Sequence, residues 1–367
     1  MRIVYAGGGT GGHINPALSI ADYVKEKNPD AKALFIGTKR GLEKKLVPAS
    51  GYDIEFIDIC GFDRKKLWKN VSVIAKLIKA NRKCKKILKD FGADAVVCTG
   101  GYVSGPVAMA AGKLKIPALI HEQNVYPGLT VKGAEKYVKY TAVSFDETIK
   151  YMSVPEKCVV TGNPVRVGIL NADEKNARKK LGMDDKPFVL VFGGSLGAQK
   201  INDTMIGVIE KAAKTKQFRL LFGTGERNFE SVCEEIKKRN IHLTEEIKVV
   251  PYINNMEDVM AAADLVISRS GAITVSEIAA LGKPSILIPS PNVVRNHQEQ
   301  NAREFEKNGA AAVITEDKLT SDLLYEKINE VINNKTVMNE MSNNVKKLGK
   351  RDATDKLYEL VKKMTEK

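Results

Sequence analysis

Three glycine-rich loops, each placed directly after a short apolar run, constrain the fold of this 367-residue chain more than any other feature. The loops are GGGTGGH (7–13) after RIVYA, GGYVSGP (100–106) after DAVVCT, and GGSLGAQ (193–199) after FVLVF. A helical pattern follows each loop. This order predicts parallel strands that turn through glycine into helices, whose first backbone amides can receive an anion or the polar edge of a sugar.

The alternation of apolar strands and helices occurs in two separate series. The first continues through ALFIG (33–37), IEFID (54–58) and PALIH (117–121), and the second through RLLFGTG (219–225), IKVVPYI (247–253), DLVISRSG (264–271) and SILIPSP (285–291). An Asn-Pro step interrupts regular structure between them, in CVVTGNPVRVGI (158–169). We therefore predict an α/β chain of two Rossmann-like domains, residues 1–163 and 164–344, with ligands bound in a cleft at the carboxyl ends of the strands. A helix over about 345–367 ends the chain and can pack back on the first domain.

The composition excludes several other classes of protein. With 43% hydrophobic and 28% charged residues the sequence is that of an ordinary globular protein, and no stretch approaches the roughly 20 apolar residues of a membrane-spanning helix. Five cysteines, an odd number without Cys-x-x-Cys spacing, predict reduced thiols and no zinc site. The apolar run at the N-terminus is too short for a signal peptide. These features predict a cytoplasmic protein that can still contact a membrane surface.

The net charge of +14 comes mainly from one stretch of the chain. Residues 64–89 contain eleven lysines and arginines and no acidic residue. On a helix, Val71, Ile74 and Ile78 share one side, while basic residues such as Lys65, Lys79 and Lys83 cluster on another, which predicts an amphipathic basic helix. Two interpretations stay open: a surface helix whose lysines are simply solvated, or docking onto anionic lipid with Trp68 at the headgroups. Nucleic-acid binding is a weaker third interpretation, because the stretch has one aromatic residue and no recognisable binding motif.

The first glycine loop raises the alternative of a dinucleotide-dependent oxidoreductase. Gly7, Gly9 and Gly12 satisfy the pattern GxGxxG. Such a site also expects an acidic residue at the end of the second strand, where it binds the ribose. TKR (38–40) stands there instead, which excludes the NAD form and leaves only a weak NADP form. Two loops in one half and one in the other suggest instead an anionic donor and an acceptor.

The segment SRSGAITVSEIAALGKPSILIP (268–289) has the order strand, glycine turn, helix, strand. Ser270, Gly271 and the first helical amides near Thr274 form an expected site for an anion or a pyrimidine. Glu277 lies in the first turns of this helix. There it can reach two neighbouring hydroxyls, or it can merely complement the helix dipole.

Seven motifs, taken together, resemble one family over nearly the whole chain. They are GGGTGGHINPAL, GGYVSGP, IHEQN (120–124), TGNPVR (161–166), GGSLGAQ, SRSGAITVSEIAALGKP and NHQEQNA (296–302). In this order and spacing they are similar to the bacterial MurG-type N-acetylglucosaminyltransferases. The resemblance implies the GT-B fold, in which two Rossmann-like domains face each other across a deep cleft. It also implies inverting transfer of GlcNAc from UDP-GlcNAc to the 4-hydroxyl of MurNAc in lipid I (undecaprenyl-pyrophosphoryl-MurNAc-pentapeptide), which forms lipid II for peptidoglycan synthesis.

The resemblance implies a role for each matching residue. The residues expected to bind the donor are Thr10, Gly11, Gly12, Asn124, Arg166, Ser195, Ile253, Ala272, Ile273, Thr274, Glu277 and Gln298. Arg166 and Ser195 are expected on the phosphates. Glu277 is expected on the ribose hydroxyls and Gln298 on the sugar. The residues expected to face the pyrophosphate of the acceptor are Gly101, Tyr102, Ser104 and Gly105.

Two residues are candidates for the base that the attacking hydroxyl needs. His13 ends the first glycine loop at the mouth of a helix, and the ordinary histidine pKa near 6.5 suits a base at neutral pH. Its alternative role is to bind substrate or cap the turn. Glu122 is the second candidate, while His121 is expected to support the local backbone. The chain has no Asp-x-Asp pair, so Arg166 and helix amides are expected to neutralise the leaving diphosphate without an obligatory metal or other cofactor.

The resemblance also favours membrane docking, because lipid I is anchored in the membrane. The expected docking residues are Trp68, Ile74, Lys76, Leu77, Ile78, Lys79, Arg82 and Lys83, flanked by Lys132, Lys136 and Lys139. The expected location is the cytoplasmic face of the cell membrane, as a peripheral protein that can meet other proteins of cell-wall synthesis. A related glycolipid synthase that glycosylates diacylglycerol is the nearest alternative. A UDP-sugar sensor, which would bind without turnover, is a more distant one.

Overall fold

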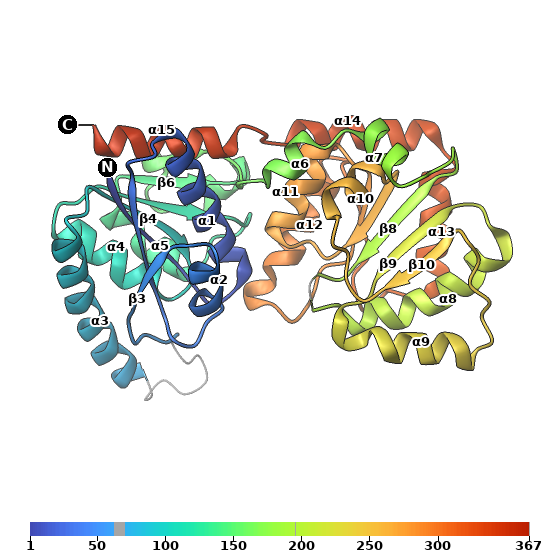
Figure 1. Cartoon of the computed structure of the whole chain (residues 1–367), viewed down its shortest axis with the longest axis horizontal. Coiled ribbons are helices and arrows are strands. Elements are labelled where there is room, and N and C mark those ends of the chain that lie inside the picture. Colours follow the sequence, from blue (N-terminus) through green and yellow to red (C-terminus); the bar gives the residue numbers. More distant parts are fainter. Residues whose placement is uncertain (62–69, 195, 367) are drawn as a thin grey trace. The chain divides into compact units, whose positions relative to one another are not determined.

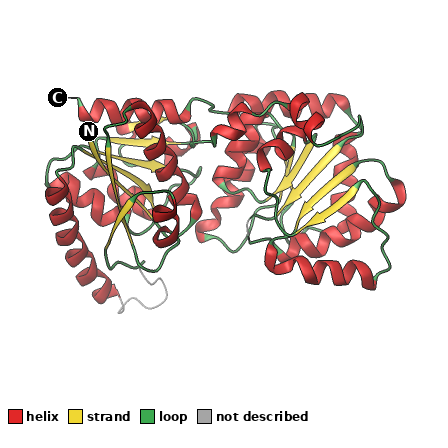
Figure 2. Ribbon diagram, in the orientation of Figure 1, coloured by secondary structure: helices red, strands yellow, loops and turns green. Residues whose placement is uncertain are grey.

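The computed structural model describes residues 1–61, 70–194 and 196–366, with no side chains described for 70–74. The chain forms two compact units (Figure 1). Unit 1 contains Met1–Pro164 and Arg351–Lys367, and unit 2 contains Val165–Lys350. Each unit has one parallel sheet with helices on both faces, as Figure 2 shows by colour.

The sheet of unit 1 has seven strands in the order β3-β2-β1-β4-β5-β6-β7, all parallel. The strands are β1 (Arg2–Gly7), β2 (Lys32–Gly37), β3 (Asp53–Phe56), β4 (Ala95–Gly100), β5 (Ala118–Glu122), β6 (Tyr140–Val143) and β7 (Cys158–Val160). The central strands β1, β4 and β5 are almost completely buried, as expected of a parallel sheet covered on both faces. Because the strands themselves are buried, the polar residues that follow their carboxyl ends are the candidates for a ligand-binding site.

Two layers of helices cover this sheet. The helices are α1 (Gly11–Lys27), α2 (Glu43–Ala49), α3 (Asn70–Phe91), α4 (Ser104–Lys113), α5 (Leu129–Ala134) and α15 (Ala353–Thr365), with 3-10 turns at Glu135–Tyr137, Asp146–Tyr151 and Pro155–Lys157. Ile3 and Tyr5 of β1 pack with α1, α2 and α15 on one face. Val4 and Ala6 pack with α3, α4 and α5 on the other, because successive strand residues point to opposite faces.

The sheet of unit 2 has six parallel strands in the order β10-β9-β8-β11-β12-β13. They are β8 (Phe188–Phe192), β9 (Arg219–Gly223), β10 (Ile247–Val250), β11 (Leu265–Ser268), β12 (Ser285–Leu287) and β13 (Ala312–Val313). The helices are α6 (Val167–Asn171), α7 (Glu174–Lys180), α8 (Gln199–Thr215), α9 (Phe229–Lys238), α10 (Met256–Ala262), α11 (Ala272–Leu281), α12 (His297–Lys307), α13 (Ser321–Ile332) and α14 (Lys335–Leu348), with 3-10 turns at Glu226–Asn228 and Val294–Asn296. The strand order turns around between β8 and β11, the usual place for a ligand in such a sheet.

The two predicted Rossmann-like domains are confirmed, and several elements differ from the prediction. Helix α1 begins at Gly11, directly within the first glycine loop, and contains Pro16 in its second turn. Strands β6, β7 and β13 were not predicted. The C-terminal segment forms two helices, of which α14 lies in unit 2 and only α15 packs on unit 1. The segment that returns to unit 1 therefore starts at Arg351 and not near residue 345.

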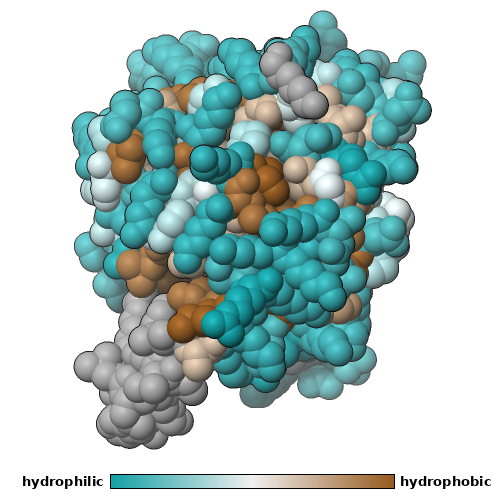
Figure 3. Space-filling model, turned by 90° about the vertical axis from the view of Figure 1, so that its left-hand side faces the viewer, coloured by the Kyte–Doolittle hydropathy of each residue, from teal (hydrophilic) through white to brown (hydrophobic). Residues whose placement is uncertain are grey.

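None of the helices formed by the described residues has the length and apolar character needed to cross a bilayer. The face of the molecule drawn in Figure 3 is mostly hydrophilic, with hydrophobic residues in a few separate groups.

Candidate active site

The first glycine loop brings His13 to the carboxyl end of β1. Thr10 has an extended backbone, and its carbonyl accepts hydrogen bonds from the amides of His13 (3.1 Å) and Ile14 (3.2 Å), which starts α1 at Gly11. Gly9 has a φ of +89°, which side chains other than glycine rarely adopt. The predicted donor residues Thr10, Gly11 and Gly12 thus lie at the N-terminus of a 17-residue helix.

The hydrogen bonds of His13 define its tautomer. Its Nδ1 lies 3.1 Å from the carbonyl oxygen of Gly8. A carbonyl can only accept, so Nδ1 carries the proton and donates it, and Nε2 of the neutral ring holds the lone pair. The backbone of His13 is fixed as well, because the Thr99 hydroxyl donates to its carbonyl at 2.6 Å. The ring lies against Gly100, where a Cβ atom would come within 2.7 Å of His13 Cδ2. This geometry suits the base predicted at this position.

The buried residue Glu43 was missed in the sequence. Its Oε2 accepts from the Gly9 amide at 2.9 Å, and its Oε1 accepts from the amide (2.9 Å) and the hydroxyl (2.7 Å) of Thr38. Burial by itself raises the pKa of the Glu43 carboxyl, but these hydrogen bonds outweigh it and the pKa lies below its ordinary value. A usable signal was present, since an acidic residue follows the second strand, only five residues later than a dinucleotide site would place it.

The second glycine loop is held against the first. Gly100 and Gly101 both have positive φ, and a Cβ atom on Gly101 would overlap the carbonyl oxygen of Gly8. Ser104 is fully buried, and its hydroxyl lies 2.9 Å from the Ala6 carbonyl and 2.7 Å from the Gly100 carbonyl. Its hydroxyl therefore supports the loop. Tyr102 is 59% exposed and Gly105 lies in the first turn of α4. Of the predicted acceptor residues, these two are the better placed to contact a ligand.

The IHEQN motif forms the third segment at this edge of the sheet. Both oxygens of the buried Glu122 accept backbone hydrogen bonds, Oε1 from Asn124 (2.9 Å) and Oε2 from Gly128 (2.8 Å). Burial raises the pKa of Glu122 even though these bonds oppose the shift. Its oxygens thus fix the loop that carries Asn124, which favours a positioning role over that of a base.

His121 is completely buried, and its surroundings support the backbone role expected of it. Its Nε2 lies 2.9 Å from the Gly162 carbonyl, and its Nδ1 lies 3.0 Å from Nε2 of Gln123. Burial lowers the pKa of His121 to about 4. Gln123 also donates to the carbonyl of Thr99 at 2.8 Å. Because Thr99 holds His13, the ends of β1, β4 and β5 form one connected network.

In unit 2, Arg166 and Glu277 form an ion pair at the start of α11. Arg166 Nε lies 2.7 Å from Glu277 Oε1, and Glu277 is buried while Arg166 is half exposed. Burial raises the pKa of Glu277, although Arg166 acts in the opposite direction. Ala272, Ile273 and Thr274 make the first turn of α11, whose N-cap is Gly271.

The remaining predicted donor residues lie at the same edge of the sheet of unit 2. Ile253 is buried, and a Cβ atom on Gly223 would come within 2.9 Å of it. Ser270 donates its hydroxyl to the backbone carbonyl of Gln298 at 2.8 Å. The side-chain oxygen of Gln298 accepts from the Ser290 amide at 2.9 Å, which fixes its orientation. Ser195 lies outside the described residues.

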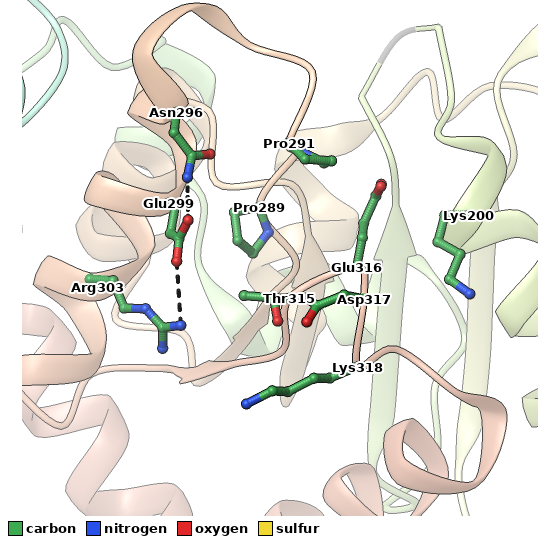
Figure 4. Close-up of a pocket in the computed structure, with 10 residues that line it drawn as sticks. All are labelled: Lys200, Pro289, Pro291, Asn296, Glu299, Arg303, Thr315, Glu316, Asp317 and Lys318. Carbon is green, nitrogen blue, oxygen red and sulfur yellow. Dashed lines mark hydrogen bonds and ion pairs between the residues drawn. The ribbon is translucent and has the colours of Figure 1, made fainter.

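A hollow of about 690 Å³ opens between the segments that follow β12 and β13 and the start of α12 (Figure 4). It is lined by Lys200, Pro289, Pro291, Asn296, Glu299, Arg303, Thr315, Glu316, Asp317 and Lys318. Next to it, the Arg269 guanidinium donates to the carbonyls of Ile288 and Pro289, each at 3.1 Å, and pairs with Glu316. The sequence predicted none of the lining residues, although Lys200 directly follows GGSLGAQ and Glu299 belongs to NHQEQNA.

The predicted docking residues on the basic helix α3 form two groups: some contact the rest of unit 1, and others are exposed. Lys76 pairs with Asp58 at 3.1 Å and Lys83 donates to the Phe56 carbonyl at 2.7 Å, so both also serve the fold. Leu77 packs against the core, whereas Ile78 is 52% exposed. Lys79 and Arg82, which lie beside Ile78, also have exposed side chains. Trp68 lies outside the described residues, as does the side chain of Ile74.

The flanking lysines lie on the same unit. Lys132, Lys136 and Lys139 each stand over a tyrosine ring, respectively Tyr126, Tyr137 and Tyr140, at 5.1 to 5.8 Å. Lys139 also donates to the Lys363 carbonyl of α15 at 3.4 Å.

Comparison with known proteins gives consistent matches over the whole chain. Models described as the N-terminal and C-terminal domains of glycosyltransferase family 28 match residues 3–143 and 188–357. A protein of Caldanaerobacter subterraneus subsp. tengcongensis is 47% identical over 366 residues and 100% of both chains. Its name is UDP-N-acetylglucosamine--N-acetylmuramyl-(pentapeptide) pyrophosphoryl-undecaprenol N-acetylglucosamine transferase. A protein of Bacillus pumilus with the same name is 44% identical over 100% of both chains.

Solved structures agree with these matches. The crystal structure of MurG from Acinetobacter baumannii superposes with a TM-score of 0.80 at 26% identity and covers 99% of both chains. A UDP-GlcNAc 2-epimerase from Neisseria meningitidis, bound to UDP-GlcNAc, gives a TM-score of 0.68 over 99% of this chain and 100% of that chain. At 14% identity the second likeness concerns the fold alone. The predicted GT-B fold class is confirmed.

Proposed function

Because the chain belongs to glycosyltransferase family 28, we propose that it transfers GlcNAc from UDP-GlcNAc to the 4-hydroxyl of MurNAc in lipid I and so forms lipid II. The observation that carries this proposal is the sequence identity of 43–47% along the whole chain to curated relatives that are named for this transfer. The polar groups at the carboxyl edges of both sheets fit the two substrates.

Unit 2 supplies the donor site in this proposal. The buried carboxylate of Glu277 accepts hydrogen bonds from the ribose hydroxyls, and the half-exposed guanidinium of Arg166 faces the diphosphate. The first amides of α11 and the third glycine loop add donors for the uracil and the phosphates. Gln298, whose side chain is fixed by the Ser290 amide, binds the sugar.

Unit 1 supplies the base. His13 Nε2 takes the proton of the 4-hydroxyl as that oxygen attacks C1 of GlcNAc, and the bond from C1 to the diphosphate oxygen breaks with its electron pair going to UDP. Attack opposite to the leaving group inverts C1. Positive charge from Arg166 and the helix amides stabilises the departing diphosphate. Glu122 keeps Asn124 in place through the loop that it binds.

Docking at the cytoplasmic face of the membrane completes the proposal, since the acceptor is a lipid. The exposed Ile78, with Lys79 and Arg82 beside it on α3, supports a contact with anionic headgroups. Lys132, Lys136 and Lys139 would extend this contact on unit 1.

The test is the release of UDP from UDP-GlcNAc in the presence of either a short-chain lipid I analogue or diacylglycerol. We expect turnover with the lipid I analogue alone. Release with diacylglycerol alone would keep the donor site and move the protein to glycolipid synthesis. Binding of UDP-GlcNAc without release in either reaction would point to a sensor and overturn the transferase proposal.

A further inference from the structure

The carboxylate of Glu43 and the imidazole of His13 bind opposite ends of one peptide group. The amide of Gly9 donates to Glu43 Oε2 at 2.9 Å, and the carbonyl of Gly8 lies 3.1 Å from His13 Nδ1. This amide and this carbonyl belong to the same peptide bond between Gly8 and Gly9. In a trans peptide the two groups point in opposite directions. The three groups therefore form a chain from carboxylate to peptide to imidazole.

The fold surrounds the Glu43 side chain with glycines. A Cβ atom on Gly8 would come within 2.8 Å of Glu43 Oε1, and one on Gly37 within 2.6 Å of its Cγ. A Cβ atom on Gly41 would overlap Oε2. These glycines come from the first loop, the end of β2 and the segment before α2, so three separate parts of unit 1 leave space for one carboxylate. The side chain is completely buried there.

A buried carboxylate at this place affects the peptide in two ways. It fixes the plane of the Gly8–Gly9 peptide, because its other oxygen is anchored on Thr38 by two hydrogen bonds. Its negative charge also polarises the peptide, which makes the Gly8 carbonyl a stronger acceptor for the Nδ1 proton of His13. Both effects hold the tautomer in which Nε2 is the basic nitrogen.

We propose that Glu43 is a positioning residue of the transferase, which acts on His13 through the Gly8–Gly9 peptide in the way that a carboxylate acts on a catalytic histidine by direct contact. The inference rests on the proposed function, since it assigns Glu43 to the same reaction. Glu43 itself does not touch the reacting atoms. It sets the orientation of the base.

The first test is Glu43→Gln in the full-length enzyme. Glutamine keeps the shape but replaces one acceptor by a donor, so it cannot accept from both Thr38 and Gly9. We expect kcat for transfer to the lipid I analogue to fall about 10- to 100-fold, as for a lost hydrogen bond to a charged group, while KM for UDP-GlcNAc changes little. A kcat within about twofold of wild type would overturn the inference.

The matched control is Glu135→Gln. Glu135 is another buried carboxylate of unit 1, and its Oε2 accepts from the amides of Ser153 and Val154 at 2.8 Å each, away from the glycine loops. This variant also loses a buried charge that holds backbone amides, and we expect it to keep the wild-type kcat. An equal loss of kcat in both variants would mean that Glu43 matters only for stability, and would contradict the inference.

A second test uses the His13→Ala background. If Glu43 acts through His13, then adding Glu43→Gln to His13→Ala should lower the residual rate no further, because residues that act as a unit are not additive. Multiplying losses would contradict the inference. Should Glu43→Gln fail to fold, Gly41→Ala replaces it, since its methyl group displaces Oε2 from Gly9 and should give the same loss and the same coupling. If wild-type enzyme releases no UDP with either acceptor, it is the proposed function that fails.

Discussion

The carboxyl edges of the two sheets are organised by groups of opposite charge. In unit 1 the carboxylates of Glu43 and Glu122 accept hydrogen bonds from backbone amides of the loops. In unit 2 the guanidinium of Arg269 donates to the backbone carbonyls of Ile288 and Pro289. In unit 1 the far end of the Gly8–Gly9 peptide, held by Glu43, binds His13, whereas in unit 2 the half-exposed guanidinium of Arg166 pairs with Glu277. In the proposed reaction unit 1 therefore positions the base and unit 2 the diphosphate.

Removing the base should have the largest effect and should be confined to unit 1. For His13→Ala we expect a fall in kcat of about 10²- to 10⁴-fold, the range of general base catalysis, measured as UDP release with the lipid I analogue. The donor should still bind with wild-type affinity in calorimetry. The exposed His242 provides the control, and His242→Ala should leave the rate unchanged. A His13→Ala enzyme with more than a tenth of the wild-type rate would move the base elsewhere.

Removing the carboxylate at α11 should affect binding rather than chemistry. For Glu277→Ala we expect the Kd for UDP-GlcNAc to rise about 10- to 100-fold, as for lost hydrogen bonds to a charged group, with a much smaller change in kcat at saturating donor. Calorimetry and initial rates measure the two quantities. Glu174→Gln is the control, because Glu174 pairs with the buried Lys283 at 2.7 Å in the same unit without belonging to the site. A loss of kcat with an unchanged Kd would erase the contrast between the two units.

Removing the charges of Lys79 and Arg82, the exposed basic residues beside Ile78, should weaken membrane binding by a similar factor. Lys79→Gln with Arg82→Gln removes two charges, each worth about 1 kcal/mol near an anionic surface, so binding to vesicles with phosphatidylserine should weaken about 30-fold. UDP binding should stay the same. The charge-matched control is Lys25→Gln with Lys27→Gln at the end of α1, also in unit 1. Equal sedimentation of both double variants with vesicles would contradict docking through α3.

Acid should destabilise unit 1 through His121. Burial lowers the pKa of His121 to about 4 in the folded state, whereas the unfolded chain has an ordinary value near 6.5. Between these two values the unfolded state binds more protons, so stability falls as the pH falls through this window. From pH 7 to pH 5 we expect a loss of about 2 kcal/mol in the free energy of unfolding, measured with urea. His121→Gln should remove this part of the pH dependence, and an unchanged slope would contradict the assignment.

Much of the fold and part of the site followed from local patterns. The strands that precede the glycine loops are continuous apolar runs, and the loops fixed where His13 and the α11 turn would lie. The parts that could not be predicted depend on contacts between distant residues. Glu43 reaches back 34 positions to Gly9, and Arg269 binds Glu316 across 47 positions. The position of Glu43 shortly after the second strand marks it as an acidic residue near the first loop, but its hydrogen bond to Gly9 becomes visible only in the fold.

The C-terminal elements show the same limit. The apolar positions of α15, such as Leu357 and Val361, predict an amphipathic helix but not the unit that covers it. Strand β13 has only two residues, and its pairing with β12 depends on the rest of the sheet. Local patterns also did not predict the roles of Ser104 and Glu122. Their polar atoms form hydrogen bonds with backbone groups of the loops rather than pointing to a ligand.

The return of α15 to unit 1 has a consequence for the order in which the protein forms during translation. Domains usually fold as they leave the ribosome, beginning with the one nearest the N-terminus. Here the face of α1 that receives Leu357, Leu360 and Val361 stays uncovered until all of unit 2 has been made. Unit 2 can therefore finish folding first, while the nascent unit 1 exposes an apolar helix face that chaperones can bind.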